Sequence, residues 1–192
     1  MKRKNRLHLN ESTLFTVKVL VAAVIVFVIA LIIATFFYMR TQVDGSSMYP
    51  TLEDKEQLIV DKHIYKTSEP QRFDIVVFET PLSETGYYIK RIIGLPGETV
   101  RIDDNGVIYI NEEKLDEEYG YEKIEDPGRA RIGVTLLEDE YFVMGDNRNH
   151  SEDSRFLIVG NIKKESFLGK ASLRIWPIEK YGYIDLYTER TK

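Results

Sequence analysis

Ser47 is a candidate nucleophile in this chain and stands in the small-residue turn Gly45-Ser46-Ser47-Met48-Tyr49-Pro50. A serine hydroxyl is a poor nucleophile until a neighbouring base takes its proton. With such a base, the hydroxyl could attack a peptide carbonyl and form a covalent acyl-enzyme. The rest of the sequence therefore has to supply a proton acceptor.

Histidine is the usual base for a serine nucleophile, and the chain has three histidines. His8 precedes a long apolar run, so only His63 and His150 share the serine's part of the chain. A Ser-His-Asp triad would join His150 to Asp146 or Asp153. The alternative is a solvated surface imidazole, because both histidines stand in polar, charged stretches.

Lys90 is the second candidate base and stands in the segment Tyr87-Tyr88-Ile89-Lys90-Arg91-Ile92-Ile93-Gly94. In a strand, alternation places Tyr88, Lys90 and Ile92 on one face. Burial among apolar neighbours would lower the pKa of the lysine by several units, which a lysine general base requires. The alternative is an edge lysine whose amine reaches water. Arg91 stays charged and needs an acidic partner or water.

Composition excludes several other classes of function. The chain has no cysteine and no H-E-x-x-H motif, so we expect no disulfide, metal or other cofactor. Residues 1–40 hold six of the 26 basic and one of the 31 acidic residues, which leaves 20 basic against 30 acidic residues in the remainder. This acidic balance argues against nucleic acid as a partner.

An apolar run is expected to place Ser47 at a membrane. Val19 to Met39 contains no charged residue, and at about 1.5 Å per residue it would span about 31 Å as a helix, close to the thickness of a bilayer core. Five of the first 18 residues are basic and one is acidic, so the amino terminus is expected in the cytoplasm. A cleaved secretory signal is the alternative, but the run is longer than the apolar region of such signals usually is. We predict a cytoplasmic segment 1–18, a transmembrane helix 19–39 and an extracytoplasmic domain 40–192.

The domain after the apolar run reads as short β segments separated by turn residues. Asn105-Gly106 and Leu95-Pro96-Gly97 predict two of the turns. The stretch 111–138 is acidic and lacks periodicity, and it is interpreted as an insertion or flap. A mainly β catalytic domain carried on one membrane helix is the predicted fold. The expected strands are Gln57–Asp61, Phe73–Phe78, Tyr87–Ile93, Thr99–Ile102, Val107–Ile110, Tyr141–Met144 and Leu168–Ile175.

Three segments together resemble type I signal peptidases. They are the serine turn, the Lys90-Arg91 strand that leads into Gly94-Leu95-Pro96-Gly97-Glu98, and the box Gly145-Asp146-Asn147-Arg148-Asn149-His150-Ser151-Glu152-Asp153-Ser154-Arg155. The order of the boxes, the apolar anchor and the terminal Arg174-Ile175-Trp176-Pro177 extend the resemblance over most of residues 17–184.

The resemblance implies a β-rich core and a Ser-Lys dyad, with Ser47 as nucleophile and Lys90 as general base. It also implies that Ser151 hydrogen-bonds the lysine amine. Asp153 would pair with Arg155 and with Arg91. Asp146 and Asn147 are interpreted as turn formers that set the geometry of the box.

One position departs from part of the family. Some members place a serine two residues before the nucleophile, where its hydroxyl helps to hold the oxyanion, whereas this chain has Gly45. The backbone N–H of Ser47 can still donate to an oxyanion, and the second donor is unassigned. Glycine also occurs there in Gram-positive members, so we do not take Gly45 as a sign of inactivity.

The predicted activity is removal of signal peptides from exported preproteins at A-x-A-type sites, next to the bilayer. Two shallow pockets for alternate side chains of an extended substrate would explain that preference, and Met48 and the strand near Phe78 are candidate neighbours. One alternative is a Ser-Lys peptidase dedicated to a pilin or another single partner. A second alternative is a membrane-tethered binding module without catalysis.

Overall fold

The structure is a computed structural model that describes residues 10–84 and 86–184. Its first unit is the helix α1, Glu11–Phe37, whose apolar 18-residue window has a mean hydropathy of 3.3. By length and composition, α1 can cross a membrane. The helix begins earlier than the apolar run because Asn10 caps it: the Asn10 side chain accepts a hydrogen bond from the Thr13 N–H at 2.7 Å.

The helix also ends two residues earlier than the predicted 19–39 span. Tyr38 and Met39 belong to the first strand β1, Tyr38–Gln42, because they pair with Asp61 and Val60 of β2. An apolar pattern alone does not separate the end of a membrane helix from an apolar strand that follows it directly.

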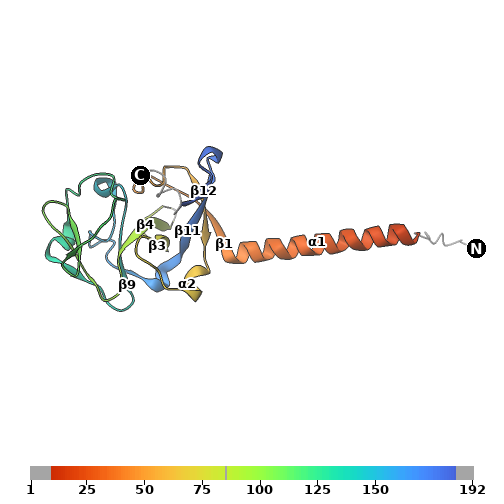
Figure 1. Ribbon diagram of the computed structural model, residues 1–192, viewed down its shortest axis with the longest axis horizontal. Helices are drawn as coiled ribbons and strands as arrows, with labels where there is room; N and C mark the ends of the chain where they lie inside the picture. The colour runs from red at the N-terminus through yellow and green to blue at the C-terminus, as the bar shows by residue number, and fades with distance from the viewer. Residues whose placement is uncertain (1–9, 85, 185–192) are drawn as a thin grey trace, which may run out of the picture. The chain divides into compact units, whose positions relative to one another are not determined.

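The second unit, residues 38–192, contains two antiparallel sheets (Figure 1). The larger has the order β1-β2-β11-β3-β4-β9-β10, with β12 also paired to β11, and the smaller has the order β7-β6-β5-β8. The mainly β fold with one amino-terminal apolar helix is therefore confirmed. The strands of the larger sheet after β1 are β2 Gln57–Asp61, β3 Ile75–Glu79, β4 Tyr87–Gly94, β9 Glu140–Met144, β10 Ile162–Lys163, β11 Phe167–Trp176 and β12 Gly182–Tyr183. Those of the smaller sheet are β5 Thr99–Ile102, β6 Ile108–Ile110, β7 Glu113–Lys114 and β8 Val134–Thr135.

Short helices complete the domain. The four-residue helix α2, Ile64–Thr67, follows β2. Four 3-10 turns are η1 Gly128–Ile132, η2 Arg148–His150, η3 Lys164–Ser166 and η4 Ile178–Lys180.

The seven predicted strands are all present, within two residues at each end, as β2, β3, β4, β5, β6, β9 and β11. Both predicted turns are confirmed as well. Gly106 adopts a φ of 77° between β5 and β6, and Gly97 adopts the same φ value in the turn before β5. Positive φ values suit glycine, which has no Cβ to clash with the backbone.

The stretch 111–138, which the sequence suggests is an insertion or flap, packs against the rest of the domain. This segment supplies four buried side chains, Ile124, Ala130, Val134 and Leu136, to the core that joins the smaller sheet to β9. Its strands are only two residues long, so they leave no alternation for a sequence pattern to detect. In Figure 1 the smaller sheet lies on the β9 side of the larger one, opposite β1.

Candidate active site

The turn that carries Ser47 is held by its apolar neighbours and by one glycine. Met48 and Leu52 are fully buried, and the Leu52 N–H donates to the Met48 carbonyl at 2.8 Å. Gly45 has a φ of 85°, and its N–H donates to Asp54 at 2.9 Å. Ser47 therefore lies between the bend at Gly45 and the buried side chain of Met48. The serine itself is half-buried.

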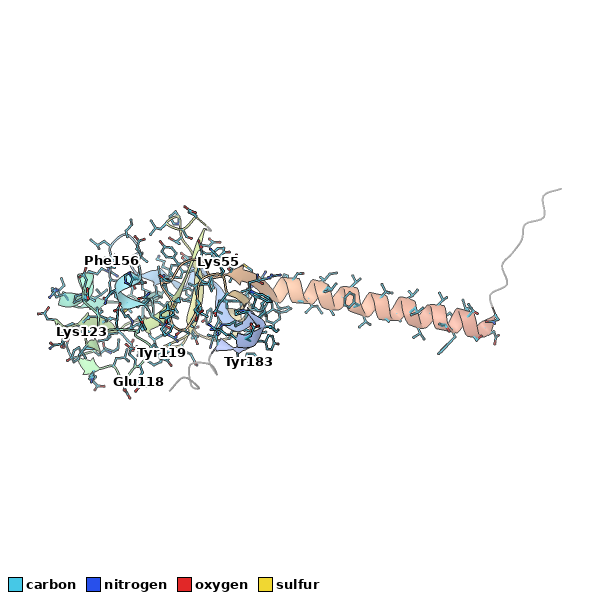
Figure 2. The ribbon with its side chains drawn as sticks, turned by 90° about the horizontal axis from the view of Figure 1, so that it is seen from above. Lys55, Glu118, Tyr119, Lys123, Phe156 and Tyr183 are labelled. Atoms are coloured by element: carbon cyan, nitrogen blue, oxygen red, sulfur yellow. The ribbon has the colours of Figure 1, made fainter. Side chains whose placement is uncertain are left out.

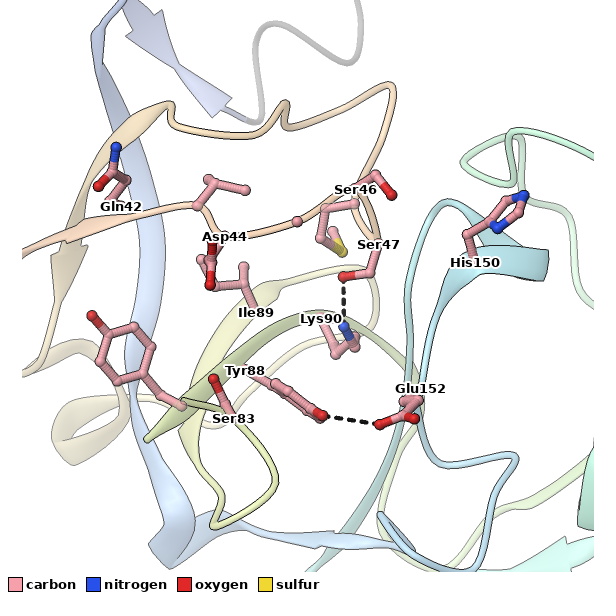
Figure 3. A pocket seen from close by; sticks show the side chains of 14 residues that line it. Gln42, Asp44, Ser46, Ser47, Ser83, Tyr88, Ile89, Lys90, His150 and Glu152 are labelled. Atoms are coloured by element: carbon pink, nitrogen blue, oxygen red, sulfur yellow. Dashed lines mark hydrogen bonds between the residues drawn. The ribbon is translucent and has the colours of Figure 1, made fainter. Parts of the chain in front are cut away.

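Lys90 reaches Ser47 directly. Its Nζ donates to Ser47 Oγ at 2.6 Å, as the dashed line in Figure 3 shows. The lysine lies in the middle of β4, opposite Val76 of β3, and only 3% of it is exposed. The interpretation of Lys90 as a residue whose amine reaches water is therefore wrong, because the side chain is buried and its amine contacts Ser47.

Burial determines the protonation of this amine. It lowers the pKa of Lys90 from 10.5 to about 8, against the opposing effect of the Asp153, Glu152 and Asp146 carboxylates. A charged amine loses hydration when it is buried, whereas the neutral amine loses much less. The neutral form has a lone pair on the nitrogen that contacts Ser47 Oγ, so Lys90 can accept the serine proton.

The pKa of Lys90 predicts how cleavage depends on pH. Only neutral Lys90 can act as a base, so kcat/KM should rise about tenfold per pH unit below pH 8 and level off above it. The measurement is kcat/KM for peptide cleavage between pH 6 and pH 10. An inflection near pH 6.5 would indicate a histidine base instead.

The box residues 145–147 support the carbonyl side of the nucleophile turn. The Asn147 backbone N–H donates to the Ser47 carbonyl at 3.0 Å, and the Asn147 side-chain amide donates to the Ser46 carbonyl at 3.1 Å. A Cβ on Gly145 would lie 2.4 Å from the Ser47 carbonyl oxygen and 2.4 Å from Ser151 Oγ. Only glycine fits at position 145 without a shift of these groups. Asn147 is thus a positioning residue as well as a turn former.

Arg91 has an acidic partner, but it is not the predicted one. Asp146 accepts from Arg91 Nε at 2.8 Å and from a terminal guanidinium nitrogen at 2.6 Å, and both side chains are buried. The expected pairing of Arg91 with Asp153 is therefore wrong. The guanidinium also stacks at 3.8 Å on the ring of Tyr119, which is labelled in Figure 2.

The second predicted pair is confirmed. Asp153 accepts from Arg155 Nε at 2.8 Å, and neither side chain is more than 1% exposed. Asp153 also accepts from the Gly145 backbone N–H at 3.1 Å. This pair therefore holds the two ends of the box together.

Ser151 is buried next to the dyad, but it does not show the predicted contact. Among the described residues its Oγ has no hydrogen-bond partner, so the expected bond to the Lys90 amine is not formed here. The hydroxyl lies against Gly145 instead, where a side chain at that position would collide with it. Its role toward Lys90 stays a prediction.

The histidine alternative does not assemble. His150 is exposed at the edge of the pocket, whereas Asp146 and Asp153 are both engaged with arginines. His63 follows β2, and its backbone N–H donates to Asp61 at 2.8 Å. The structure therefore places a lysine, not an imidazole, on Ser47.

A cavity of about 300 Å³ opens beside the dyad. Its apolar wall is formed by Val43, Met48 and Ile89. Met48, which the sequence predicts as a neighbour of the substrate pockets, lines this cavity and is also buried in the core. Phe78 is not among the lining residues and is buried in a separate cluster. The three residues 42–44 also line the cavity. The sequence did not predict this, because the stretch has no recognisable pattern.

The segment 111–138 also contacts the box. Glu117 pairs with Arg148 at 2.7 Å, and the Tyr121 N–H donates to the Asp146 carbonyl at 2.9 Å. The Glu125 N–H donates to the Asn149 side chain at 3.0 Å. These contacts hold the box residues in place against the segment 111–138.

The sequence is similar to those of known proteins over most of its length. Residues 16–176 match the family model described as signal peptidase, peptidase S26. The chain is 39% identical over 179 residues to a probable signal peptidase I-2 from Synechocystis, which covers 90% of this chain and 78% of the relative. It is 38% identical over 168 residues to signal peptidase I T from Bacillus subtilis, which covers 83% of this chain and 84% of the relative. A crystal structure of a signal peptidase I from Enterococcus faecalis is 38% identical, with a TM-score of 0.44, and covers 55% of this chain and 98% of that one.

Proposed function

Because the chain belongs to the signal peptidase family, peptidase S26, we propose that Ser47 and Lys90 form the dyad with which it removes signal peptides. The family makes the protein a serine peptidase whose substrates are preproteins with signal peptides. The observation that carries the assignment of the dyad is the 2.6 Å contact between Ser47 Oγ and a buried lysine amine.

The proposed reaction has two proton transfers in each half. Neutral Lys90 takes the Ser47 proton as Oγ attacks the peptide carbonyl carbon, and the backbone N–H of Ser47 donates to the oxygen that becomes negative. Lys90 then protonates the leaving amine, which departs as the new amino terminus of the mature protein. Water attacks the remaining ester as Lys90 takes a proton from it. Lys90 then returns this proton to Ser47 Oγ, and the signal peptide leaves with a carboxyl terminus. No step requires a metal ion.

The geometry of β4 supports an extended substrate. β3 pairs with β4 along Tyr87–Arg91, but β9 pairs with it only from Arg91 onward. In the described part of the chain, Tyr88–Lys90 thus has a strand on one side only. A preprotein segment added at that edge would present alternate side chains to the wall of Val43, Met48 and Ile89. Two substrate side chains that face this wall would be the ones to which the A-x-A preference implied by the family refers.

The proposed location is the cell membrane, with α1 across the bilayer and the domain outside. The apolar helix and the basic residues before it support this orientation. Protease added to spheroplasts should digest the domain. Its protection would contradict the outward orientation.

The proposed function is tested with the full chain in detergent and a preprotein that carries an Ala-x-Ala site. Wild type should cleave after that motif, as shown by sequencing of the new amino terminus, whereas Ser47→Ala should not. Failure of folded wild type to cleave generic preproteins would favour a dedicated pilin or partner peptidase, or a binding module.

A further inference from the structure

A second cavity adjoins the dyad pocket and has no role in the reaction described above. It measures about 460 Å³ and shares His150 and Glu152 with the dyad pocket. Its other walls include Phe156 and Ile158. Because the two cavities have lining residues in common, a chain bound at Ser47 can continue from one into the other.

The position of this cavity relative to the dyad indicates which part of a substrate it would hold. In Figure 3, Gln42 lies on one side of the Ser47–Lys90 contact, whereas His150 and Glu152 lie on the other. Ile89 lies on the Gln42 side in Figure 3, and Val43 follows Gln42 in the chain, so the apolar wall for small side chains before the cut extends to that side. The residues after the cut must therefore leave toward Glu152.

Glu152 gives the second cavity a fixed negative charge. Its carboxylate accepts from the Tyr88 hydroxyl at 3.1 Å. Burial and this contact raise the pKa of Tyr88, so the tyrosine remains a donor. Among the described residues, no lysine, arginine or histidine forms an ion pair with Glu152. The carboxylate is exposed and can receive a cation from a substrate.

Apolar side chains lie beside this charge. Ile158 is 67% exposed, and Phe156, labelled in Figure 2, is half-buried. Lysine and arginine side chains combine a long apolar stem with a charged end, so they match a wall of this kind next to a carboxylate. An acidic side chain would meet repulsion at the same place.

We propose that the cavity of Glu152, Phe156 and Ile158 binds the first two residues of the mature protein and favours basic over acidic side chains there. This inference rests on the proposed function, because it assigns a subsite to the same cleavage reaction.

The test compares three peptides that differ only in the two residues after the cut, which are Lys-Lys, Gln-Gln or Glu-Glu. The quantity is the ratio of kcat/KM for the Lys-Lys peptide to kcat/KM for the Glu-Glu peptide. Glu152 also influences the pKa of Lys90, so its variants change the overall rate, but that change cancels in a ratio measured at one pH. Wild type should favour Lys-Lys by about fivefold, which is the upper end of the range for one exposed ion pair.

Two variants of the site and one control complete the design. Glu152→Gln should bring the ratio to within about twofold of one, and Glu152→Lys should invert it. Glu113→Gln removes an exposed carboxylate from β7 of the smaller sheet and should keep the wild-type ratio. A wild-type ratio near one, or a preference that survives in Glu152→Gln, would overturn the inference. Failure of wild type to cleave even the Gln-Gln peptide would count against the proposed function itself.

Discussion

Lys90→Met is expected to lower kcat/KM for signal-peptide cleavage by at least about 10³-fold, because the variant has no base on Ser47. Methionine has nearly the length of lysine and fills the same buried space without a titratable amine. Lys90→Arg should fail equally, since a guanidinium stays protonated. The measurement is kcat/KM at pH 8 for each variant.

The stability of Lys90→Met shows whether a loss of activity comes from unfolding. Burial of Lys90 lowers its pKa from 10.5 to about 8, so keeping the charged form in the folded state costs about 3 kcal/mol below pH 8. This cost falls as the pH rises from 8 and disappears above about 10.5, where the amine is neutral in both states. Lys90→Met should therefore be at least as stable as wild type at pH 7. A stable variant that keeps more than a tenth of the activity would refute Lys90 as the base.

The largest expected loss of stability comes from Asp146→Asn. Arg91 and Asp146 form a buried pair, with 3% and 0% of their side chains exposed, so loss of one charge leaves the other buried without compensation. Such a change costs about 3–5 kcal/mol, which should lower the melting temperature of the full chain in detergent by roughly 10 °C. Circular dichroism measures the transition.

Two further variants show whether that loss comes from the buried charge. Glu112→Gln removes one member of the surface pair Arg101–Glu112 and should change the melting temperature far less than Asp146→Asn, because water screens an exposed pair. The double variant Arg91→Met with Asp146→Leu should recover part of the lost melting temperature, because it leaves no unpaired charge. Equal melting temperatures for Asp146→Asn and Glu112→Gln would contradict a structural role for the buried pair.

Ser47 and Lys90 as candidate residues, and most strands, could be predicted from the sequence because their signals are local. Lys90 stands in eight consecutive residues with a clear strand pattern, and Ser47 stands in a turn of small residues. The two residues are 43 positions apart, so their contact followed only from the resemblance to a family.

The partner of Arg91 could not be predicted in the same way. Asp146 and Asp153 stand seven positions apart in one box, and either could face a strand from a distant part of the chain. The 3-10 turn η2 between them decides which carboxylate points to β4, and it turns Asp153 toward Arg155. The need for glycine at position 145 could not be predicted either. It follows from the close approach of Ser47 and Ser151, which are distant from each other in the sequence.

The most direct test of the Ser47–Lys90 assignment is the titration of Lys90 itself. In protein labelled at the lysine ε-carbons, the Lys90 signal is identified by its loss in Lys90→Met and followed by NMR from pH 6 to pH 12. The structure predicts a midpoint near pH 8. A midpoint near 10.5 would mean that Lys90 carries its proton at the pH of catalysis, and it would contradict the role of Lys90 as the base.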